Sequence, residues 1–192
     1  FINEDPLLVC SLVETSKMRW LYPDTVGNYF NTGFNAKVAP TCEVLMMAKN
    51  NNDTDYWGNS PIGNAHYYAN FASALQYYRY GSSTLINTGV ALPIGEAHLW
   101  SVGKEIKLDG VLRYTTSNTY TPNESQTPIY IFRSGRGYPN TFNLAMFRIY
   151  DGEELKHTFV PFLRNGQMEM LDILTGTLAT RVGTFTEQIT PA

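Results

Sequence analysis

Residues 148–186 read RIYDGEELKHTFVPFLRNGQMEMLDILTGTLATRVGTFT, and this stretch decides the fold class of the chain. Short runs of alternating apolar and polar residues are separated by three turn dipeptides, Asp151-Gly152, Asn165-Gly166 and Thr175-Gly176. Asn-Gly and Asp-Gly readily adopt the positive φ angles that tight hairpin turns require. Since the turns follow one another closely, the stretch predicts antiparallel hairpins and leaves no room for a long helix.

Upstream of this stretch the chain again shows short apolar runs that are typical of strands. We expect strands at residues 7–13, 43–48, 75–81, 97–102, 105–108, 111–115, 129–132 and 144–150. The polar segments 50–64 and 117–127 are predicted to be long loops, and residues 66–74 are the one place where a helical turn is expected. Short strands at this spacing predict an all-β fold, a two-sheet antiparallel sandwich of the jelly-roll type.

The apolar runs also predict which side chains fill the core, because alternate residues of a strand point to opposite faces of a sheet. The residues that we expect to point mostly inward are Leu45, Met47, Leu108, Phe147, Ile149, Phe159 and Leu171. Trp20 and Trp100 lie in apolar surroundings and are expected in the core as well. Of the tyrosines between residues 67 and 80, alternation should turn roughly half inward.

Three segments together resemble a known family. VGNYFNTGF (residues 26–34) is similar to the opening signature of laminin-G-like and concanavalin-like jelly-roll domains, a Ser-Thr-Gly turn followed by Q-Y-I-D-T-G. KLDG (residues 107–110) resembles the Y-I-D-G hairpin of that family, and residues 148–186 resemble its C-terminal end. The chain departs from the pattern at Thr25-Val26 and at Asn31. The resemblance spans residues 20–186 and implies a surface-recognition module of the kind found in bacteriophage tail or virion proteins and in surface proteins of gut bacteria.

Length and charge narrow the class of protein further. The 192 residues fit a single jelly-roll domain over residues 1–192, with residues 1–19 as an N-terminal strand or extension. A net charge of −3 without a Lys/Arg cluster argues against nucleic-acid binding. No apolar run approaches the roughly 20 residues of a membrane span, so membrane insertion is not expected. The start has no initiator Met, and we expect a processed form or the ordered part of a longer protein.

Catalytic patterns are weak throughout the sequence. Glycoside hydrolysis needs two carboxyl groups about 5–10 Å apart, and no strand carries them at alternate positions. The pair Asp53 and Asp55 is better explained as part of a solvated loop, and Glu153-Glu154 as a hairpin tip. No metal-ligand spacing joins the three histidines, and residues 134–137 lack the Lys-Ser/Thr of a phosphate-binding loop. The sequence therefore predicts no catalytic residues.

Two cysteines and one Asn-rich loop raise the questions of a disulfide and of a metal ion. Cys10 and Cys42 could pair, but we expect both thiols to be free, with Cys10 buried in an apolar strand. No cofactor is predicted. Calcium is the one ion to be weighed, since related jelly rolls hold it in loops, and Asp53 and Asp55 are its candidate ligands. An ordinary solvated loop accounts for these residues better.

The strongest binding candidate is the same loop, where the candidate contact residues are Asp55, Tyr56, Trp57 and Asn59. Sugars present apolar ring faces edged by hydroxyl groups, so an aromatic platform flanked by Asp and Asn suits them. The alternative is that Trp57 anchors the loop into the core, which is slightly favoured.

The sequence thus favours a non-catalytic module that recognises surface glycans and acts in adhesion, as part of a virion or an extracellular cell-surface assembly. The alternative is a purely structural virion component, a capsid decoration or fibre protein that binds other virion proteins or further copies of itself. A glycosidase or lyase is less favoured. The sequence does not choose between phage and bacterial origin, and it names neither a sugar nor an oligomeric state.

Overall fold

The computed structural model describes residues 19–25, 27–49, 54–59, 67–72, 74–81, 86–122, 127–133 and 142–189. Within these ranges the chain forms strands and turns and contains no helix. The strands are β1 (Arg19–Pro23), β2 (Tyr29–Asn31), β3 (Pro40–Ala48), β4 (Thr54–Asn59), β5 (Tyr67–Ala72), β6 (Ala74–Tyr80), β7 (Val90–Ala91), β8 (Ala97–Val102), β9 (Glu105–Leu108), β10 (Val111–Thr115), β11 (Ile129–Ile131), β12 (Phe142–Asp151), β13 (Glu154–Arg164), β14 (Gln167–Asp172), β15 (Thr177–Leu178), β16 (Thr180–Val182) and β17 (Phe185–Ile189).

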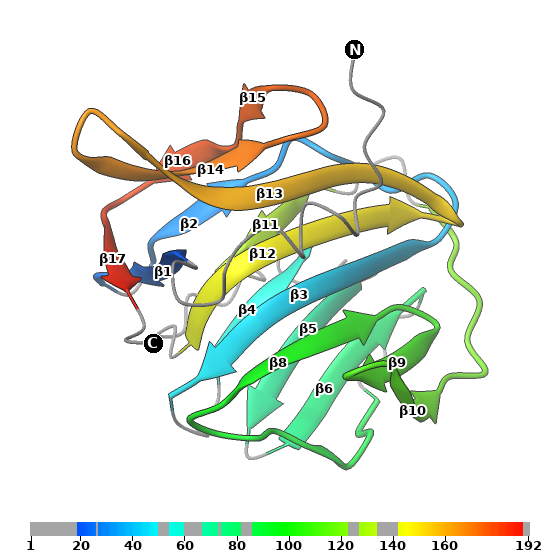
Figure 1. Cartoon of the computed structure of the whole chain (residues 1–192). Coiled ribbons are helices and arrows are strands. Elements are labelled where there is room, and N and C mark those ends of the chain that lie inside the picture. The colour runs from blue at the N-terminus through cyan, green and yellow to red at the C-terminus, as the bar shows by residue number, and fades with distance from the viewer. Residues whose placement is uncertain are drawn as a thin grey trace.

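The strands form two antiparallel sheets that pack face to face (Figure 1). The larger sheet has the order β10-β9-β8-β3-β12-β13-β14-β15, with β1 paired to β12 and β17 paired to β1. The smaller sheet, behind it in Figure 1, has the order β16-β2-β11-β4-β5-β6-β7. The chain passes from the larger to the smaller sheet at Ala179, between β15 and β16. The expected all-β fold of two antiparallel sheets is confirmed.

The hairpin turns form where the dipeptides predicted them. Asn165 and Gly166 have φ angles of 51° and 74°, and Asp109 and Gly110 have φ angles of 51° and 76°. Two successive positive φ angles define the type I′ turn, whose twist matches that of the strands it joins. These turns connect β13 to β14 and β9 to β10, and Asp151-Gly152 leads from β12 into β13.

The core lies between the sheets and is dominated by aromatic rings. Tyr56 of the smaller sheet stacks on Phe142 of the larger one with ring centroids 4.3 Å apart, and Trp57 meets Phe147 edge to face at 5.9 Å. The buried hydroxyl of Tyr67 donates to the carbonyl of Val102 at 2.6 Å and accepts from the backbone N–H of Cys42 at 3.2 Å. One polar side chain of the smaller sheet is thereby tied to two strands of the larger sheet.

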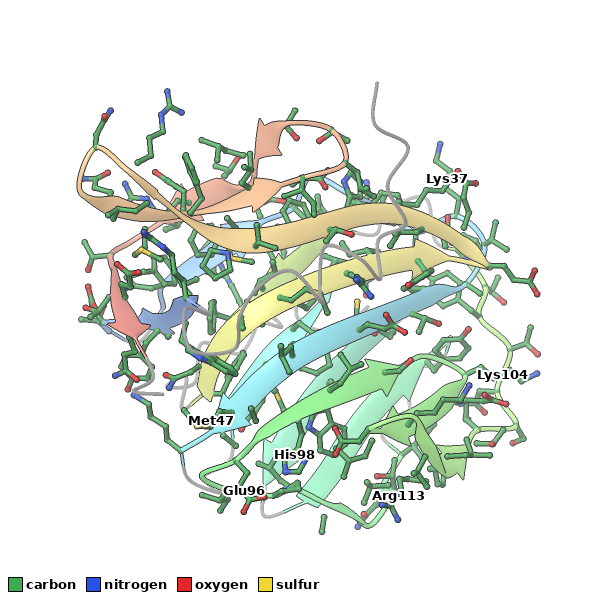
Figure 2. The ribbon with its side chains drawn as sticks, in the orientation of Figure 1. Lys37, Met47, Glu96, His98, Lys104 and Arg113 are labelled. Carbon is green, nitrogen blue, oxygen red and sulfur yellow. The ribbon has the colours of Figure 1, made fainter. Side chains whose placement is uncertain are left out.

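Most of the predicted core residues are confirmed. In two strands, however, some of the residues that were predicted to face the core face outward. Residues Leu108, Phe147, Ile149, Phe159, Trp20 and Trp100 are buried, as predicted. In β3 the inward residues are Val44, Met46 and their alternates, so Leu45 and Met47 are only half-buried on the outer face (Met47 is labelled in Figure 2). The run VLMM is apolar at every position, so the sequence does not indicate which alternate residues face the core. Leu171 is likewise half-buried, while its neighbour Met170 faces the core.

Two local predictions were wrong because pairing between strands overrides the local preference of the sequence. Residues 54–59, expected in a loop, form β4, and residues 67–72, expected to include a helical turn, form β5. The Asp, Gly and Asn of β4 disfavour a strand locally, but pairing with β5 on one side and β11 on the other overrides that preference. Residues 117–122 of the second expected loop form no strand.

Some predictions concern residues outside the described ranges: the strand at 7–13, Cys10, Asp53, His66 and the loop 134–137. Cys42 is a free thiol buried in the core. Burial raises the pKa of this thiol to about 12, against a smaller opposing effect of its hydrogen bond with Tyr67.

Candidate ligand-binding surface

The structure places three of the four predicted binding residues, Tyr56, Trp57 and Asn59, in the interior. Tyr56 and Trp57 are each 0% exposed, and the amide oxygen of buried Asn59 accepts the backbone N–H of Tyr67 at 2.9 Å. The register of β4 with β5 shifts between Asp55 and Trp57, which face the consecutive residues Asn70 and Ala69, so Tyr56 is the extra residue of a β-bulge. A bulge re-aims side chains, so that two successive aromatic residues point inward. These rings offer no platform to a ligand, and the alternative that Trp57 anchors its segment into the core is confirmed.

The two predicted calcium ligands, Asp53 and Asp55, lie outside the described side chains. Asp55 lies in β4, where the structure describes only its backbone, and Asp53 lies outside the described residues. Among the residues that are described, no three His, Cys, Asp or Glu side chains are grouped so that they could hold a metal ion.

Buried carboxylates in the described ranges serve the fold. The carboxylate of Asp151 accepts the backbone N–H groups of Lys37, Val38 and Ala39 at 2.7 to 2.8 Å. It thereby fixes the chain segment that enters β3, beside the hairpin turn to which Asp151 itself belongs. Lys37 is labelled at this end of the larger sheet in Figure 2.

Two histidines sit in the same hydrogen-bonding arrangement on different hairpins. Nδ1 of His98 lies 2.7 Å from Oδ2 of Asp109, and Nδ1 of His157 lies 2.8 Å from Oδ2 of Asp172. In each case the other carboxylate oxygen accepts, at 2.9 Å, the backbone N–H of the residue that follows the histidine. Figure 2 shows His98 and Glu96 at the same end of the larger sheet as Arg113. Because each carboxylate bridges two strands of one hairpin, these pairs stabilise the hairpins.

An aromatic cluster with an arginine lies on the outer face of the smaller sheet. Phe30 of β2 and Ile129 and Ile131 of β11 are fully buried, so alternation turns Tyr29 and Tyr130 outward. The two tyrosine rings meet edge to face, with centroids 5.4 Å apart and an interplanar angle of 85°. Asn31, which pairs with Tyr130 across the strands, faces outward as well.

Arg133 completes this cluster. The Cζ atom of its guanidinium lies 4.5 Å from the ring centroid of Tyr29 and 5.7 Å from that of Tyr130. We refer to Tyr29, Asn31, Tyr130 and Arg133 together as the aromatic surface. All four side chains are half-buried, so they are held in place by their neighbours and remain accessible to solvent.

The backbone conformation of Phe132 determines where Arg133 lies. Phe132 has a φ angle of 64°, in the left-handed region that bulky residues rarely occupy. Continued as a regular strand, β11 would turn Phe132 outward beside Tyr130 and Arg133 inward. Instead Phe132 is only 2% exposed, and Arg133 lies over the outward tyrosine rings.

In comparisons with known proteins, no family model, no curated protein and no solved structure matches this chain. None of the described residues belongs to a helix that is long and apolar enough to cross a membrane.

The aromatic surface was not predicted from the sequence. Tyr29 and Asn31 fall within the segment 26–34 that carries the family resemblance, and Tyr130 alternates with two isoleucines. Those patterns could have identified three outward side chains on neighbouring strands. No sequence pattern indicates the left-handed conformation of Phe132, so the position of Arg133 could not be predicted.

Proposed function

We propose that the protein is a non-catalytic recognition module of the concanavalin-like or laminin-G-like jelly-roll type, which binds surface glycans through its aromatic surface. We further propose that it acts on a virion or on a bacterial cell surface. The observation that carries the proposal is the pair of half-buried rings of Tyr29 and Tyr130 beside Asn31. Such rings stack on the apolar face of a sugar, while an amide bonds its hydroxyl groups.

The hydrogen bonding of Asn31 supports this role. Its amide oxygen accepts the backbone N–H of Gly33 at 2.9 Å, which fixes the orientation of the side chain. The amide NH₂ group therefore points away from that bond, and no described residue accepts from it, so its donors can bind sugar hydroxyls. A donor that is held in place loses less conformational freedom when a ligand binds.

Substitution of Tyr130 tests the proposal. In Tyr130→Ala the stacking platform is removed, and we expect glycan affinity to fall by about 1–3 kcal/mol, roughly 10-fold to 100-fold. The fold should be retained because Tyr130 is only half-buried. The measurement is a glycan array followed by titration of the best ligand, with thermal melts of each variant.

Tyr22 provides the matched control, because it is a half-buried tyrosine of β1 that also lies under a cation, the Nζ atom of Lys49 at 3.6 Å. Tyr22→Ala should leave glycan affinity unchanged. Failure of the wild-type protein to bind any surface glycan would contradict the proposal.

A structural role in a virion is the second candidate, and the exposed edge of the larger sheet favours it. β10 is the terminal strand of that sheet, and its residues Val111 and Leu112 are 53% and 52% exposed. An apolar edge strand can pair with a strand of another protein. If the wild type binds no glycan but associates through this edge, Val111→Lys should abolish the association in light-scattering measurements. A glycosidase or lyase is the least favoured role, because buried Asp151 and Asp172 are engaged in structural hydrogen bonds.

A further inference from the structure

We infer that the glycan bound by the aromatic surface is acidic, and that the guanidinium of Arg133 binds its carboxylate. This inference rests on the proposed function and adds the chemical class of the ligand to it. It is carried by three observations: the position of the Arg133 guanidinium over two tyrosine rings, the lack of an anionic partner among the described residues, and the left-handed conformation of Phe132.

The contact with the two rings places the guanidinium of Arg133 over the aromatic surface. Its Cζ atom lies above the Tyr29 ring and nearer to it than to the Tyr130 ring, at 4.5 Å against 5.7 Å. A cation–π contact of this kind does not use up the N–H groups of a guanidinium, which remain able to donate hydrogen bonds. Two parallel N–H donors match the two oxygens of a carboxylate, which gives a bidentate, charge-assisted contact.

Three other arginines of the described chain are already neutralised, whereas Arg113 and Arg164, like Arg133, form no ion pair with a described residue. Arg19, Arg148 and Arg181 pair with Glu187, Glu43 and Glu169 at 3.3 to 3.4 Å. For Arg133 the contacts within the described residues are the two tyrosine rings, and no carboxylate joins them. A cation that is held over tyrosine rings beside Asn31, with no acidic partner among the described residues, is available to an anionic ligand.

The conformation of Phe132 indicates that the position of Arg133 is imposed by the fold. A left-handed conformation in a bulky residue costs roughly 1–2 kcal/mol. Here it is stabilised by the burial of the phenyl ring and by a backbone hydrogen bond from Phe132 N–H to the carbonyl of Tyr56 at 2.8 Å. Strained residues of this kind are concentrated at binding sites, where surrounding contacts hold them. The next residue along the chain is the cation that lies over the tyrosines.

A carboxylate would give selectivity as well as affinity. A neutral sugar that covers Arg133 removes water from the guanidinium without supplying an anionic acceptor, and leaving a polar group unsatisfied is costly. An acidic sugar compensates for that loss with charge-assisted hydrogen bonds. The same rings would stack on both sugars, so the arginine alone should discriminate between them.

The test compares sugars that differ only in charge. The probes are oligogalacturonate, hyaluronan oligosaccharides and sialyllactose, each paired with its counterpart in which the carboxyl group is reduced to a hydroxymethyl group. Titration calorimetry with the wild-type protein should show a preference of about 10-fold to 100-fold for at least one acidic member over its reduced counterpart. The preference should decline as the NaCl concentration is raised, because salt screens the charge.

Variants of Arg133 test whether this residue causes the preference for acidic sugars. Arg133→Gln should remove the preference and leave binding of the reduced sugar nearly unchanged. Arg133→Lys keeps the charge but loses the planar fork, and it should restore only part of the preference. Lys49→Gln removes another cation that lies over a tyrosine, Tyr22, and should change neither affinity. Thermal melts would show that each variant is folded.

The outcomes separate this inference from the proposed function. Equal binding of acidic and reduced sugars, abolished by Tyr130→Ala and unaffected by Arg133→Gln, would overturn the inference and support the proposed function. A preference for acidic sugars that persists in Arg133→Gln would also overturn it. Binding of no sugar of either kind, in this panel and on a wider array, would overturn both.

Discussion

At the scale of single residues, Trp57 is the side chain whose removal should cost the fold most. Its ring is fully buried against Phe147, and its indole N–H donates to the hydroxyl of Tyr67 at 3.3 Å. Trp57→Ala would leave a cavity at the centre of the sandwich, and we expect the free energy of unfolding to fall by about 3–5 kcal/mol. Urea denaturation measures this loss, and Trp57→Phe, which keeps an aromatic ring, should lose less. A loss within about 0.5 kcal/mol, the usual range of surface substitutions, would contradict the assigned role.

Asp172 should make the stability of the protein depend on pH. Burial alone would raise the pKa of this carboxyl group, but hydrogen bonds from the Thr175 hydroxyl, the Thr158 N–H and His157 outweigh it and lower the pKa below its usual value of 3.8. A lowered folded-state pKa stabilises the protein above the unfolded-state value, and this contribution is lost as the pH falls through the folded-state pKa. We therefore expect wild type to exceed Asp172→Asn in stability at neutral pH, with the difference shrinking below about pH 4.

Denaturant titrations of both proteins between neutral and acidic pH measure that difference. Asp109 provides the comparison, because its pKa is also lowered, by hydrogen bonds from His98 and Leu99 that outweigh its desolvation, while its side chain is half exposed. Asp109→Asn should have the smaller effect, since water screens an exposed group more strongly. A difference for Asp172→Asn that stays constant into acid would show that its charge does not contribute.

Single residues also explain why the sequence predicted the kind of candidate site but not the residues that form it. An aromatic platform beside an asparagine was predicted at Tyr56, Trp57 and Asn59, and such a platform occurs instead around Tyr29 and Tyr130. The bulge at Tyr56 turns an aromatic pair inward, and the left-handed Phe132 brings an arginine outward. Each is a backbone irregularity stabilised by tertiary contacts, so neither leaves a pattern in the sequence.

At the scale of elements, two glycines at strand ends show different costs of adding a side chain. At one the cost comes from backbone strain alone, and at the other it comes from steric overlap as well. Gly166 has a φ of 74°, and a Cβ added there would meet no atom within 4 Å, so Gly166→Ala should cost only about 1–2 kcal/mol. Gly81, which follows β6, has a φ of 63°, and a Cβ there would overlap the carbonyl oxygen of Thr119. We expect Gly81→Ala to cost roughly 3 kcal/mol or more. Thermal unfolding of both variants gives the comparison, and equal losses would contradict it.

The elements that could be predicted are those specified by local chemistry. Asn165-Gly166 and Asp109-Gly110 select their turn type themselves, so the hairpins around them form where the sequence indicates. β4 could not be predicted, because its pairing partners β5 and β11 decide it. The facing of β3 could not be predicted either, because the pattern that encodes it is absent from a uniformly apolar run.

At the scale of the whole molecule, Arg181 ties the two sheets together along one edge. It belongs to β16 of the smaller sheet, and its guanidinium donates to Glu169, at 3.3 Å, and to Gln167, both on β14 of the larger sheet. The chain crosses between the sheets at Ala179, two residues before Arg181. The two-sheet architecture was predictable from the strand pattern, whereas this side-chain link joins residues whose proximity only the folded chain creates.

Removal of that link should loosen the sandwich where the sheets meet. Arg181→Ala deletes hydrogen bonds to a carboxylate and an amide, and we expect a loss of about 1–2 kcal/mol in the free energy of unfolding.

Arg19→Ala is the matched control, because Arg19 pairs with Glu187 within the larger sheet at the same 3.3 Å but is 46% exposed. An exposed pair within one sheet should contribute less than about 1 kcal/mol. Hydrogen exchange should show faster opening of β14 and β16 in Arg181→Ala than in Arg19→Ala, since the link that joins these strands is gone. Equal losses in the two variants, with unchanged exchange in β14 and β16, would mean that aromatic packing alone holds the sheets together.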